Sequence, residues 1–219
     1  DRRIVLAVHE SGAVMRMSKE LSSGRQLVIE VAEDQTDCGR KLLSQLATRA
    51  DSVAVGEAVE VDACCTTVRL RSGKHEVVVE EPDYAQDPSR FIASLSVTCL
   101  ISDSQQRLLH ELGVNEDHVA ASQYLEVSQE AMRSVSVVGY RREDQEEPFT
   151  GWQIVATTGA AAEDSWGMYS VRELAAHRLV WIVPLVLPVG WSFRCVGNTL
   201  VDCVSPARQT HPLNISIDI

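Results

Sequence analysis

The sequence lacks the short motifs on which most enzyme active sites depend. It contains no G-x-S-x-G nucleophile turn, no G-x-x-x-x-G-K-[ST] phosphate loop and no C-x-x-C pair. The six histidines are dispersed along the chain and do not cluster near the cysteines, which argues against a zinc site. We therefore expect a protein that is not an enzyme and that uses no cofactor and no metal.

Long apolar runs are also missing. The longest, residues 179–189, is interrupted by Pro184 and Pro188, and it is shorter than the roughly 20 residues that a membrane-spanning helix needs. The N-terminal residues do not show the charged, apolar and small-residue order of a secretory signal, although the sequence starts at Asp1. We expect no contact with membranes.

Cysteine is sparse and scattered. The 219 residues include six cysteines at positions without metal-ligand spacing, namely Cys38, Cys64, Cys65, Cys99, Cys195 and Cys203. In a chain of this size, scattered cysteines are typical of buried apolar side chains in a reducing cytoplasm, which is the location we expect. A redox role for Cys64-Cys65 and a hydrolase with a reactive cysteine remain as alternatives.

Lysine is scarce, and the net charge of −11 disfavours binding to nucleic acid or to anionic membranes. An acidic protein of this kind suits a basic partner, although distributed acidic charge can also serve solubility alone. All three lysines lie in the first half of the chain, and all four tryptophans lie in the second. This shift in composition indicates two modules, 1–117 and 118–219, with the boundary at Val114–His118.

Hydrophobic periodicity predicts an α+β fold in both modules, each a mainly antiparallel sheet with packed helices. In the first module it predicts strands at Arg3–His9, Gln26–Val31 and within 53–80, and helices at Gln35–Arg49, Pro88–Ser102 and Asp103–Leu112. The first of these helices should begin with a cap at Thr36 or Asp37, and the last should stop at Gly113.

The second module shows a similar mixture of elements. Here the periodicity predicts strands at Gln123–Val127, Val135–Tyr140 and Trp152–Ala156. It also predicts a helical turn capped by Ser128, a helix that begins at Ser170 and ends at Pro184, and a hairpin around Gly197-Asn198. The final residues alternate between apolar and polar side chains. Such a segment should pair with a sheet edge in its own chain or in a neighbouring copy, so we expect a homo-oligomer that forms through Leu213, Ile215, Ile217 and Ile219.

The second module also contains an acidic bridge between two predicted strands. Its carboxylates belong to Glu143, Asp144, Glu146 and Glu147. They show no Asp-x-Asp spacing, and the two preceding arginines can neutralise them locally, so a catalytic or metal-binding role is disfavoured. The bridge is either a solvated loop or a loop that binds a partner.

Two tryptophans near the bridge differ in their surroundings. Trp152 opens an apolar strand and should belong to the core, whereas Trp166 lies in a predicted loop with Glu163 and Asp164. Tryptophan contributes strongly to binding energy when a partner buries it. We therefore expect Glu163, Asp164 and Trp166 to join the acidic bridge in a contact surface.

Residues 123–204 resemble a known family, the bacterial polymorphic-toxin immunity protein family thirty-three. The resemblance rests on an ordered set of short matches: Ser128, Val138-Gly139-Tyr140, Arg142-Glu143, Glu147-Pro148, Gly151-Trp152, Glu163-Asp164, Pro184-Leu185, Leu187-Pro188-Val189-Gly190 and Phe193. It implies an α+β domain without known enzymatic activity that acts beside a secreted toxin, such as a type VI secretion effector. The segment after Trp152 departs from the family because it carries alanines in place of further acids.

Together these features predict an immunity protein. It would bind a cognate protein toxin, a basic nuclease, and block the toxin's active site or its assembly. The contact residues would be those of the bridge together with Glu163, Asp164 and Trp166. The alternative is an oligomeric scaffold or regulatory binding protein, in which the apolar tail builds the assembly.

Overall fold

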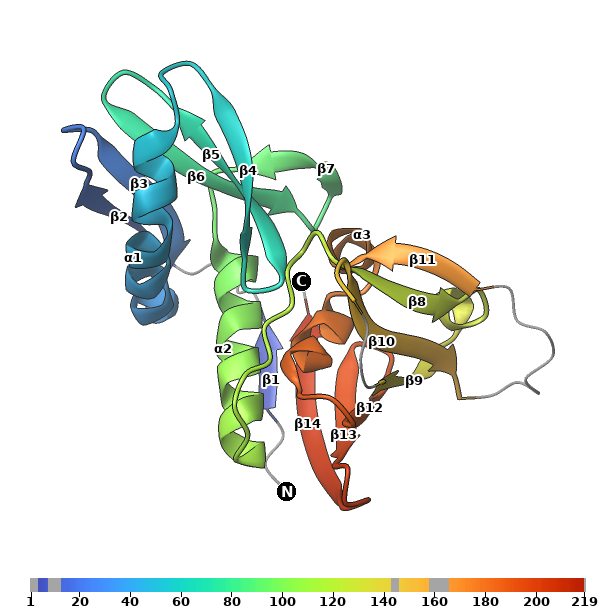
Figure 1. Ribbon diagram of the computed structural model, residues 1–219. Helices are drawn as coiled ribbons and strands as arrows, with labels where there is room; N and C mark the ends of the chain where they lie inside the picture. The colour runs from blue at the N-terminus through green and yellow to red at the C-terminus, as the bar shows by residue number, and fades with distance from the viewer. Residues whose placement is uncertain (1–3, 8–12, 143–145, 158–165, 219) are drawn as a thin grey trace. The chain divides into compact units, whose positions relative to one another are not determined.

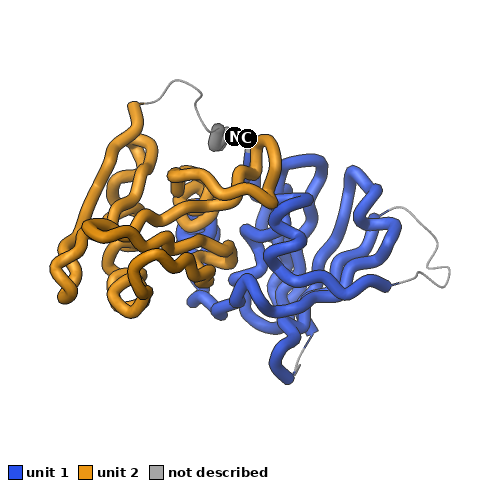
Figure 2. Tube along the Cα trace, turned by 90° about the horizontal axis from the view of Figure 1, so that it is seen from above, with its two compact units in different colours: residues 1–7, 104–218 blue, residues 8–103, 219 orange. Residues whose placement is uncertain are grey.

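The computed structural model describes residues 4–7, 13–142, 146–157 and 166–218. The chain forms two compact units, which Figure 2 shows in different colours. Unit 1 takes in residues 1–7 and 104–218, and unit 2 takes in residues 8–103 together with residue 219. Each unit has a sheet and packed helices, so the predicted α+β class is confirmed. The division into domains at residues 117 and 118 stays a prediction.

Unit 2 is built on a six-stranded sheet. Its strands are β2 (Val14–Glu20), β3 (Gln26–Ala32), β4 (Ala58–Ala63), β5 (Thr66–Ser72), β6 (Glu76–Asp83) and β7 (Asp87–Ile92) (Figure 1). They follow the order β2-β3-β6-β5-β4, and β7 pairs with β6. Only β3 and β6 pair in parallel, so the described part of this sheet is mainly antiparallel, as expected.

The core of unit 2 lies between this sheet and helix α1 (Thr36–Ser52), which a short 3-10 turn, η1 (Glu33–Gln35), precedes. Leu27 and Ile29 of β3 are fully buried, as are Leu42 and Leu46 on the apolar stripe of α1. Strand β3 and helix α1 were both predicted from their periodicity, and both predictions are confirmed. The predicted cap is wrong, because the residue that precedes α1 is Gln35 and no side chain caps this end.

The prediction of two helices, at Pro88–Ser102 and Asp103–Leu112, is wrong. Residues 87–92 form strand β7, and a single helix, α2 (Ser96–Leu112), follows. The N–H groups of Val97 and Thr98 donate to the Glu81 carboxylate at 3.0 and 2.8 Å, so a distant side chain caps the start of α2. The stop at Gly113 is confirmed, and its φ of 64° is one that glycine adopts without strain.

The turn between β4 and β5 consists of Cys64 and Cys65. Both residues have positive φ, 51° and 59°, and Ala63 pairs with Thr66 on either side of them. A two-residue hairpin with two such φ values usually contains asparagine or glycine, so local residue preference does not indicate this turn.

Unit 1 is built on an eight-stranded sheet. Its strands are β1 (Ile4–Ala7), β8 (Tyr124–Ser128), β9 (Ser136–Arg141), β10 (Phe149–Ala156), β11 (Trp166–Ser170), β12 (Ser192–Val196), β13 (Thr199–Val204) and β14 (Thr210–Asp218). They follow the order β1-β14-β13-β12-β9-β10-β8-β11, as Figure 1 shows for the labelled arrows. The strands β1 and β11 therefore lie at the two edges of this sheet in the part of the chain that the structure describes.

The three helical segments η2, α3 and η3 of unit 1 agree only in part with the helices predicted from the sequence. Ser128 was predicted to cap a helical turn here, but the residue that precedes η2 (Ala131–Arg133) is Glu130; the Ser128 hydroxyl does accept a hydrogen bond from the N–H of Ala131 at 3.1 Å. Ser170 caps α3 (Val171–His177) through a reciprocal capping box with Glu173. Pro184 does not end this helix, since α3 ends before Arg178 and Pro184 lies inside the buried 3-10 helix η3 (Leu179–Val186).

Candidate functional site: one end of the sheet in unit 1

The structure describes three of the seven residues predicted to contact a toxin. Glu146 and Glu147 are exposed just before β10, and Trp166 begins the edge strand β11 with 45% of its surface exposed. Glu143, Asp144, Glu163 and Asp164 lie outside the described residues. The acidic bridge does connect two antiparallel strands, β9 and β10, as the sequence indicated.

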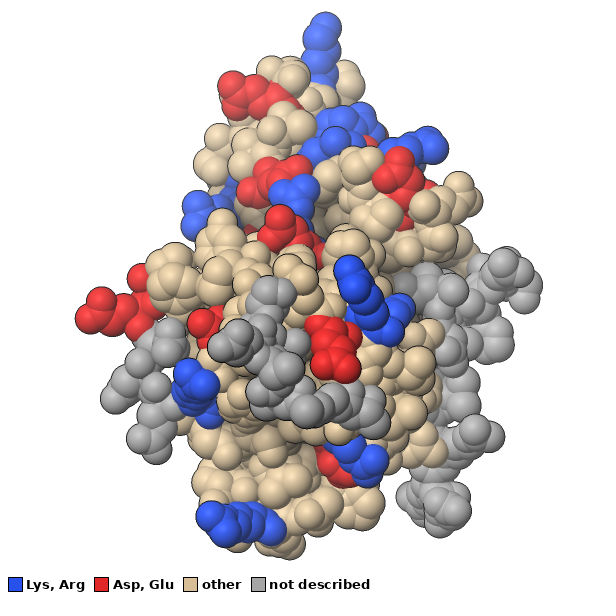
Figure 3. All heavy atoms as spheres, turned by 90° about the vertical axis from the view of Figure 1, so that its right-hand side faces the viewer, with Lys and Arg blue, Asp and Glu red and all other residues tan. Residues whose placement is uncertain are grey.

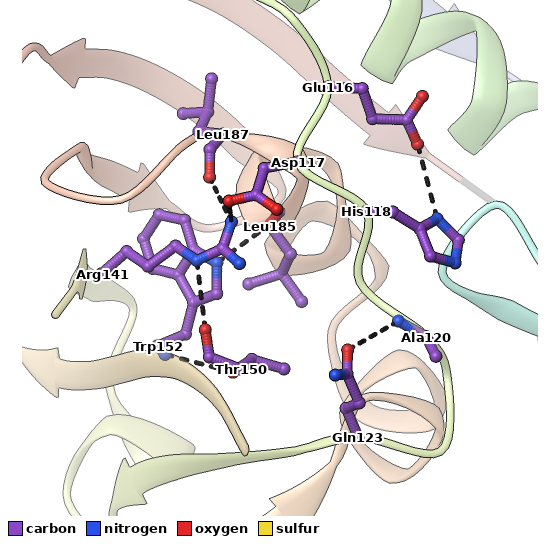
Figure 4. Close-up of polar contacts among 10 residues, drawn as sticks. All are labelled: Glu116, Asp117, His118, Ala120, Gln123, Arg141, Thr150, Trp152, Leu185 and Leu187. Atoms are coloured by element: carbon purple, nitrogen blue, oxygen red, sulfur yellow. Dashed lines mark hydrogen bonds and ion pairs between the residues drawn. The ribbon is translucent and has the colours of Figure 1, made fainter. Parts of the chain in front are cut away.

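Arg141, at the end of β9, holds the base of this bridge in place. Its guanidinium donates to the carbonyl oxygens of Thr150 at 3.1 Å and Leu187 at 2.7 Å, and it lies 3.0 Å from the Asp117 carboxylate (Figure 4). Only 8% of the Arg141 side chain is exposed. Hydrogen bonds between a charged donor and buried carbonyls are among the stronger ones in proteins, so this side chain fixes β9, β10 and the end of η3 together.

Trp152 belongs to the core, as predicted. It is 1% exposed, and its indole N–H donates to the carbonyl of Leu185 at 3.0 Å. Its ring lies against Phe193, with 5.3 Å between the centroids. Phe193 in turn occupies the space beside Gly139, where an added Cβ would lie 2.2 Å from the nearest ring carbon. The core therefore depends on glycine at position 139.

The opposite, outer face of the sheet carries a cluster of exposed apolar side chains. In the register, Met168 of β11 lies opposite Glu126 of β8, and Tyr124 of β8 lies opposite Phe149 of β10. Opposed residues share one face of a sheet, and Trp166 lies two residues before Met168 on the same face. We call Tyr124, Phe149, Trp166 and Met168, each 40–46% exposed, the outer-face patch.

A shallow hollow lies within this patch. Its volume is about 210 Å³, including space open to solvent, and its lining includes Tyr124, Phe149, Met168 and Gln153. Gln153 is only 5% exposed, and its side-chain N–H group donates to the Glu126 carboxylate. Its Oε1 is buried without a hydrogen-bond partner among the described residues. An unmade hydrogen bond of this kind costs about 1–3 kcal/mol.

Charge is mixed on the face of the molecule that Figure 3 presents. Acidic and basic side chains of the described residues lie close beside one another in several places, with uncharged surface around them. At the hollow itself, Glu126 is accompanied by Arg142, whose guanidinium carbon lies 6.0 Å from the centre of the Tyr140 ring. The described acidic side chains therefore do not form one continuous area on this face.

Among the six cysteines, Cys64 alone is partly exposed in the described structure. All six are free, and all but Cys64 are buried. In unit 2 a hydrogen bond between two thiols lowers the pKa of Cys38 and raises that of Cys99. In unit 1 burial raises the pKa of Cys195 and Cys203. The interpretation of the cysteines as core side chains holds for five of them.

Neither a metal site nor a membrane span is found in the described ranges. No three His, Cys, Asp or Glu side chains gather there in an arrangement that could hold a metal ion. No helix of the described chain is long and apolar enough to cross a bilayer.

The apolar C-terminal segment pairs within its own chain. It forms β14, which lies between β13 and β1, with Ile215 and Ile217 buried. Leu213 is partly buried, and Ile219 lies outside the described residues. Assembly of copies through this segment stays a prediction.

Residues 104–205 match the Imm33-like domain, which belongs to an immunity-protein family, and the resemblance seen in the sequence is thereby confirmed. The match begins where the second segment of unit 1 begins, at Ser104, and includes strands β8 to β13. Immunity proteins of this kind are typically not enzymes. No match was found among curated proteins or among solved structures.

Sequence reasoning missed the outer-face patch, apart from Trp166. Tyr124 and Phe149 are 25 positions apart, and only the parallel pairing of β8 with β10 brings them together. A partial signal was present, since Tyr124 and Glu126 alternate with the buried Leu125 and Val127. Alternation shows that one face is outward, but it does not show which strand lies beside it.

Proposed function

We propose that this chain is an immunity protein that binds the toxic domain of a cognate bacterial effector and neutralises it. The observation that carries this proposal is the Imm33-like domain, which occupies most of unit 1. The exposed outer-face patch supports it, as does the burial of both cysteines of this domain and the lack of a metal-binding group among the described residues. Neutralisation then proceeds by occlusion, in which the bound chain covers the toxin's active site or blocks its assembly.

The toxin is a basic nuclease in this proposal. A net charge of −11 accelerates encounter with a cationic partner and helps to orient it. Enzymes that act on nucleic acid carry basic surfaces because their substrate is a polyanion. The encounter takes place in the cytoplasm of a cell that receives or produces the toxin, and a type VI secretion effector is the class that the family resemblance implies.

The acidic bridge and the segment before β11 would make the first contacts. Glu146 and Glu147 are exposed at the base of the bridge, and the firmly held Arg141 fixes the strand from which the bridge departs. Glu143, Asp144, Glu163 and Asp164 would complete the acidic side of the contact, and Trp166 would anchor it.

The proposal is tested by toxicity and rescue. Each reading frame that neighbours the gene for this chain is expressed in a bacterial host, with and without this chain. We expect one basic product that kills the host alone and is harmless when this chain is present. If no neighbouring product is toxic, or if this chain does not protect the host, the proposed function is wrong.

The acidic contacts are tested with the toxin identified in that way. Replacing Glu143, Asp144, Glu146 and Glu147 by alanine should slow association by about tenfold or more at low salt, because electrostatic steering is lost. The matched control replaces four exposed acids of unit 2, Glu20, Glu33, Asp34 and Glu57, which changes the net charge by the same amount. Equal association rates for the two variants would remove the bridge from the contact surface.

A further inference from the structure

We infer that the outer-face patch is the central contact with the toxin, and that the toxin inserts a lysine or arginine side chain beside Gln153. This inference rests on the proposed function and deepens it, because it moves the centre of the contact from the acidic bridge to the sheet. The juxtaposition that carries it is a buried acceptor without a partner, on a residue that lines one hollow together with the exposed Tyr124, Phe149 and Met168.

The first argument is the unmade hydrogen bond of Gln153. Its amide N–H group is committed to the Glu126 carboxylate, which leaves Oε1 as an acceptor. Buried side-chain acceptors are normally satisfied by protein or by ordered water. A donor from a partner would supply the missing bond, and binding would then remove a cost that the free protein carries.

The second argument is the composition of the patch. Tyrosine, tryptophan, phenylalanine and methionine are the residue types that interface centres favour. Tyr124, Phe149, Trp166 and Met168 bring all four together over three adjacent strands at one edge of the sheet. Methionine is flexible, so the exposed Met168 can move aside to admit a side chain to the hollow.

The third argument is charge. Glu126 lies at the hollow with its carboxylate on the Gln153 amide, and the chain carries a net charge of −11. A lysine or arginine can lay its methylene stem against Tyr124 and Phe149 while its charged head donates to Gln153 Oε1 and faces Glu126. Arg142 also lines the hollow, so the inserted cation must lie beside Glu126 and away from this guanidinium.

A second exposed apolar position of the same sheet serves as a comparison surface. Val196, at the end of β12 and opposite Ser136 of β9, is 39% exposed. Neither of the two unpartnered buried atoms among the described residues, Gln35 Oε1 and Gln153 Oε1, belongs to this surface. Exposed apolar side chains therefore occur on both surfaces, and the buried acceptor Gln153 Oε1 is the feature that distinguishes the outer-face patch from the comparison surface.

The experiment measures binding of full-length variants to the toxin identified by rescue. Met168→Asp should weaken binding at least about tenfold, whereas Val196→Asp, at a similarly exposed strand position of the same sheet, should change it less than about threefold. Gln153→Met should weaken binding by about tenfold. Its control is Gln105→Met, which removes another buried amide of unit 1, bonded to the carbonyl of Ile182.

The outcomes separate this inference from the proposed function. If the wild-type chain protects against the toxin and binds it, but Met168→Asp binds equally well, the patch is not the contact and the function stands. If Gln153→Met alone is without effect, the cation does not reach Gln153 and the inference is overturned in that part. If no toxin is neutralised, the function fails and this inference falls with it.

A crosslinking measurement keeps the test valid if Met168→Asp does not fold. A photoreactive phenylalanine derivative replaces Tyr124, which is a conservative change at an exposed position, or Val196. We expect a crosslink to the toxin from position 124 and none from position 196. A crosslink from position 196 alone would contradict the inference.

Discussion

The guanidinium of Arg141 lies 3.0 Å from the carboxylate of Asp117, and the two residues differ sharply in burial: 8% of the arginine side chain is exposed, against 43% of the aspartate. The ion pair is therefore open to solvent on one side and contributes little by itself. The stabilising contacts of Arg141 are those to the carbonyls of Thr150 and Leu187, at 3.1 and 2.7 Å.

Arg141→Met should lower the free energy of unfolding of unit 1 by about 3 kcal/mol, because it leaves two carbonyl oxygens without their charged donor. Urea denaturation followed by tryptophan fluorescence measures this, since all four tryptophans lie in unit 1. Arg194→Met is the control: Arg194 is 48% exposed and paired with Asp202, so its loss should cost less than about 1 kcal/mol. Equal losses for both variants would contradict the anchoring role of Arg141.

Gly139→Ala should destabilise unit 1 by about 1–3 kcal/mol or more, because the new methyl group would overlap the Phe193 ring, 2.2 Å away. The control is Gly197→Ala, where nothing lies within 4 Å and only the φ of 57° is strained. Thermal unfolding and the near-ultraviolet circular dichroism of Trp152 provide the readout. Phe193→Leu should relieve part of the cost of Gly139→Ala, and strict additivity of the two changes would show that the contact is not responsible.

Particular residues show which secondary-structure elements could be predicted from the sequence and which could not. Strand β3 and helix α1 were predicted because Leu27, Ile29 and Val31 alternate and because Leu42 and Leu46 recur at helical spacing. A helix was wrongly predicted at Pro88 because Asp87-Pro88 is a favourable sequence for the start of a helix. The strand there is selected by pairing with β6, a contact that local propensity does not encode.

The candidate site shows the same limit. Trp152 in the core and Trp166 at the surface were predicted from their immediate neighbours. Gln153 was not recognised, because its missing partner becomes evident only when β8 lies beside β10 and Glu126 occupies the amide. Sequence spacing identifies faces of elements, whereas an unmade hydrogen bond is a property of the assembled sheet.

Glu81 should make unit 2 less stable as pH rises. Burial raises the pKa of this carboxyl above its usual range, an effect that the donors at Thr98 and Val97 only partly offset. The unfolded chain releases the proton near pH 4.3, while the folded chain retains it to higher pH, so the folded state binds more protons between the two values. Stability therefore falls across this window, and hydrogen exchange of the β6 amides of Val77 and Val79 measures the slope.

Glu81→Gln should flatten that slope, because the amide does not titrate, even though it makes one fewer hydrogen bond to the start of α2. Glu57→Gln, at an exposed position of the same unit, should leave the slope unchanged. A wild-type stability that increases with pH over this window, or a slope that Glu81→Gln retains, would refute the assignment to Glu81.

Thiol labelling tests whether this chain has a reactive cysteine. In the native protein Cys64 should react first with iodoacetamide, because it is partly exposed in its turn and the other five are buried. Cys38 should react slowly at neutral pH in spite of its lowered pKa, since only 3% of it is exposed. Cys64→Ala should remove the fast phase, and a fast thiol that survives this substitution would revive the hydrolase alternative.

The most direct test of the account is a stoichiometric titration of the toxin's activity with this chain. Occlusion predicts that activity falls linearly and reaches zero when one bound chain is present for each toxin molecule, and that full toxin activity returns after the complex is dissociated. Inactivation of many toxin molecules by one copy of this chain, or a toxin that stays inactive after separation, would contradict occlusion and show that this chain acts by chemistry.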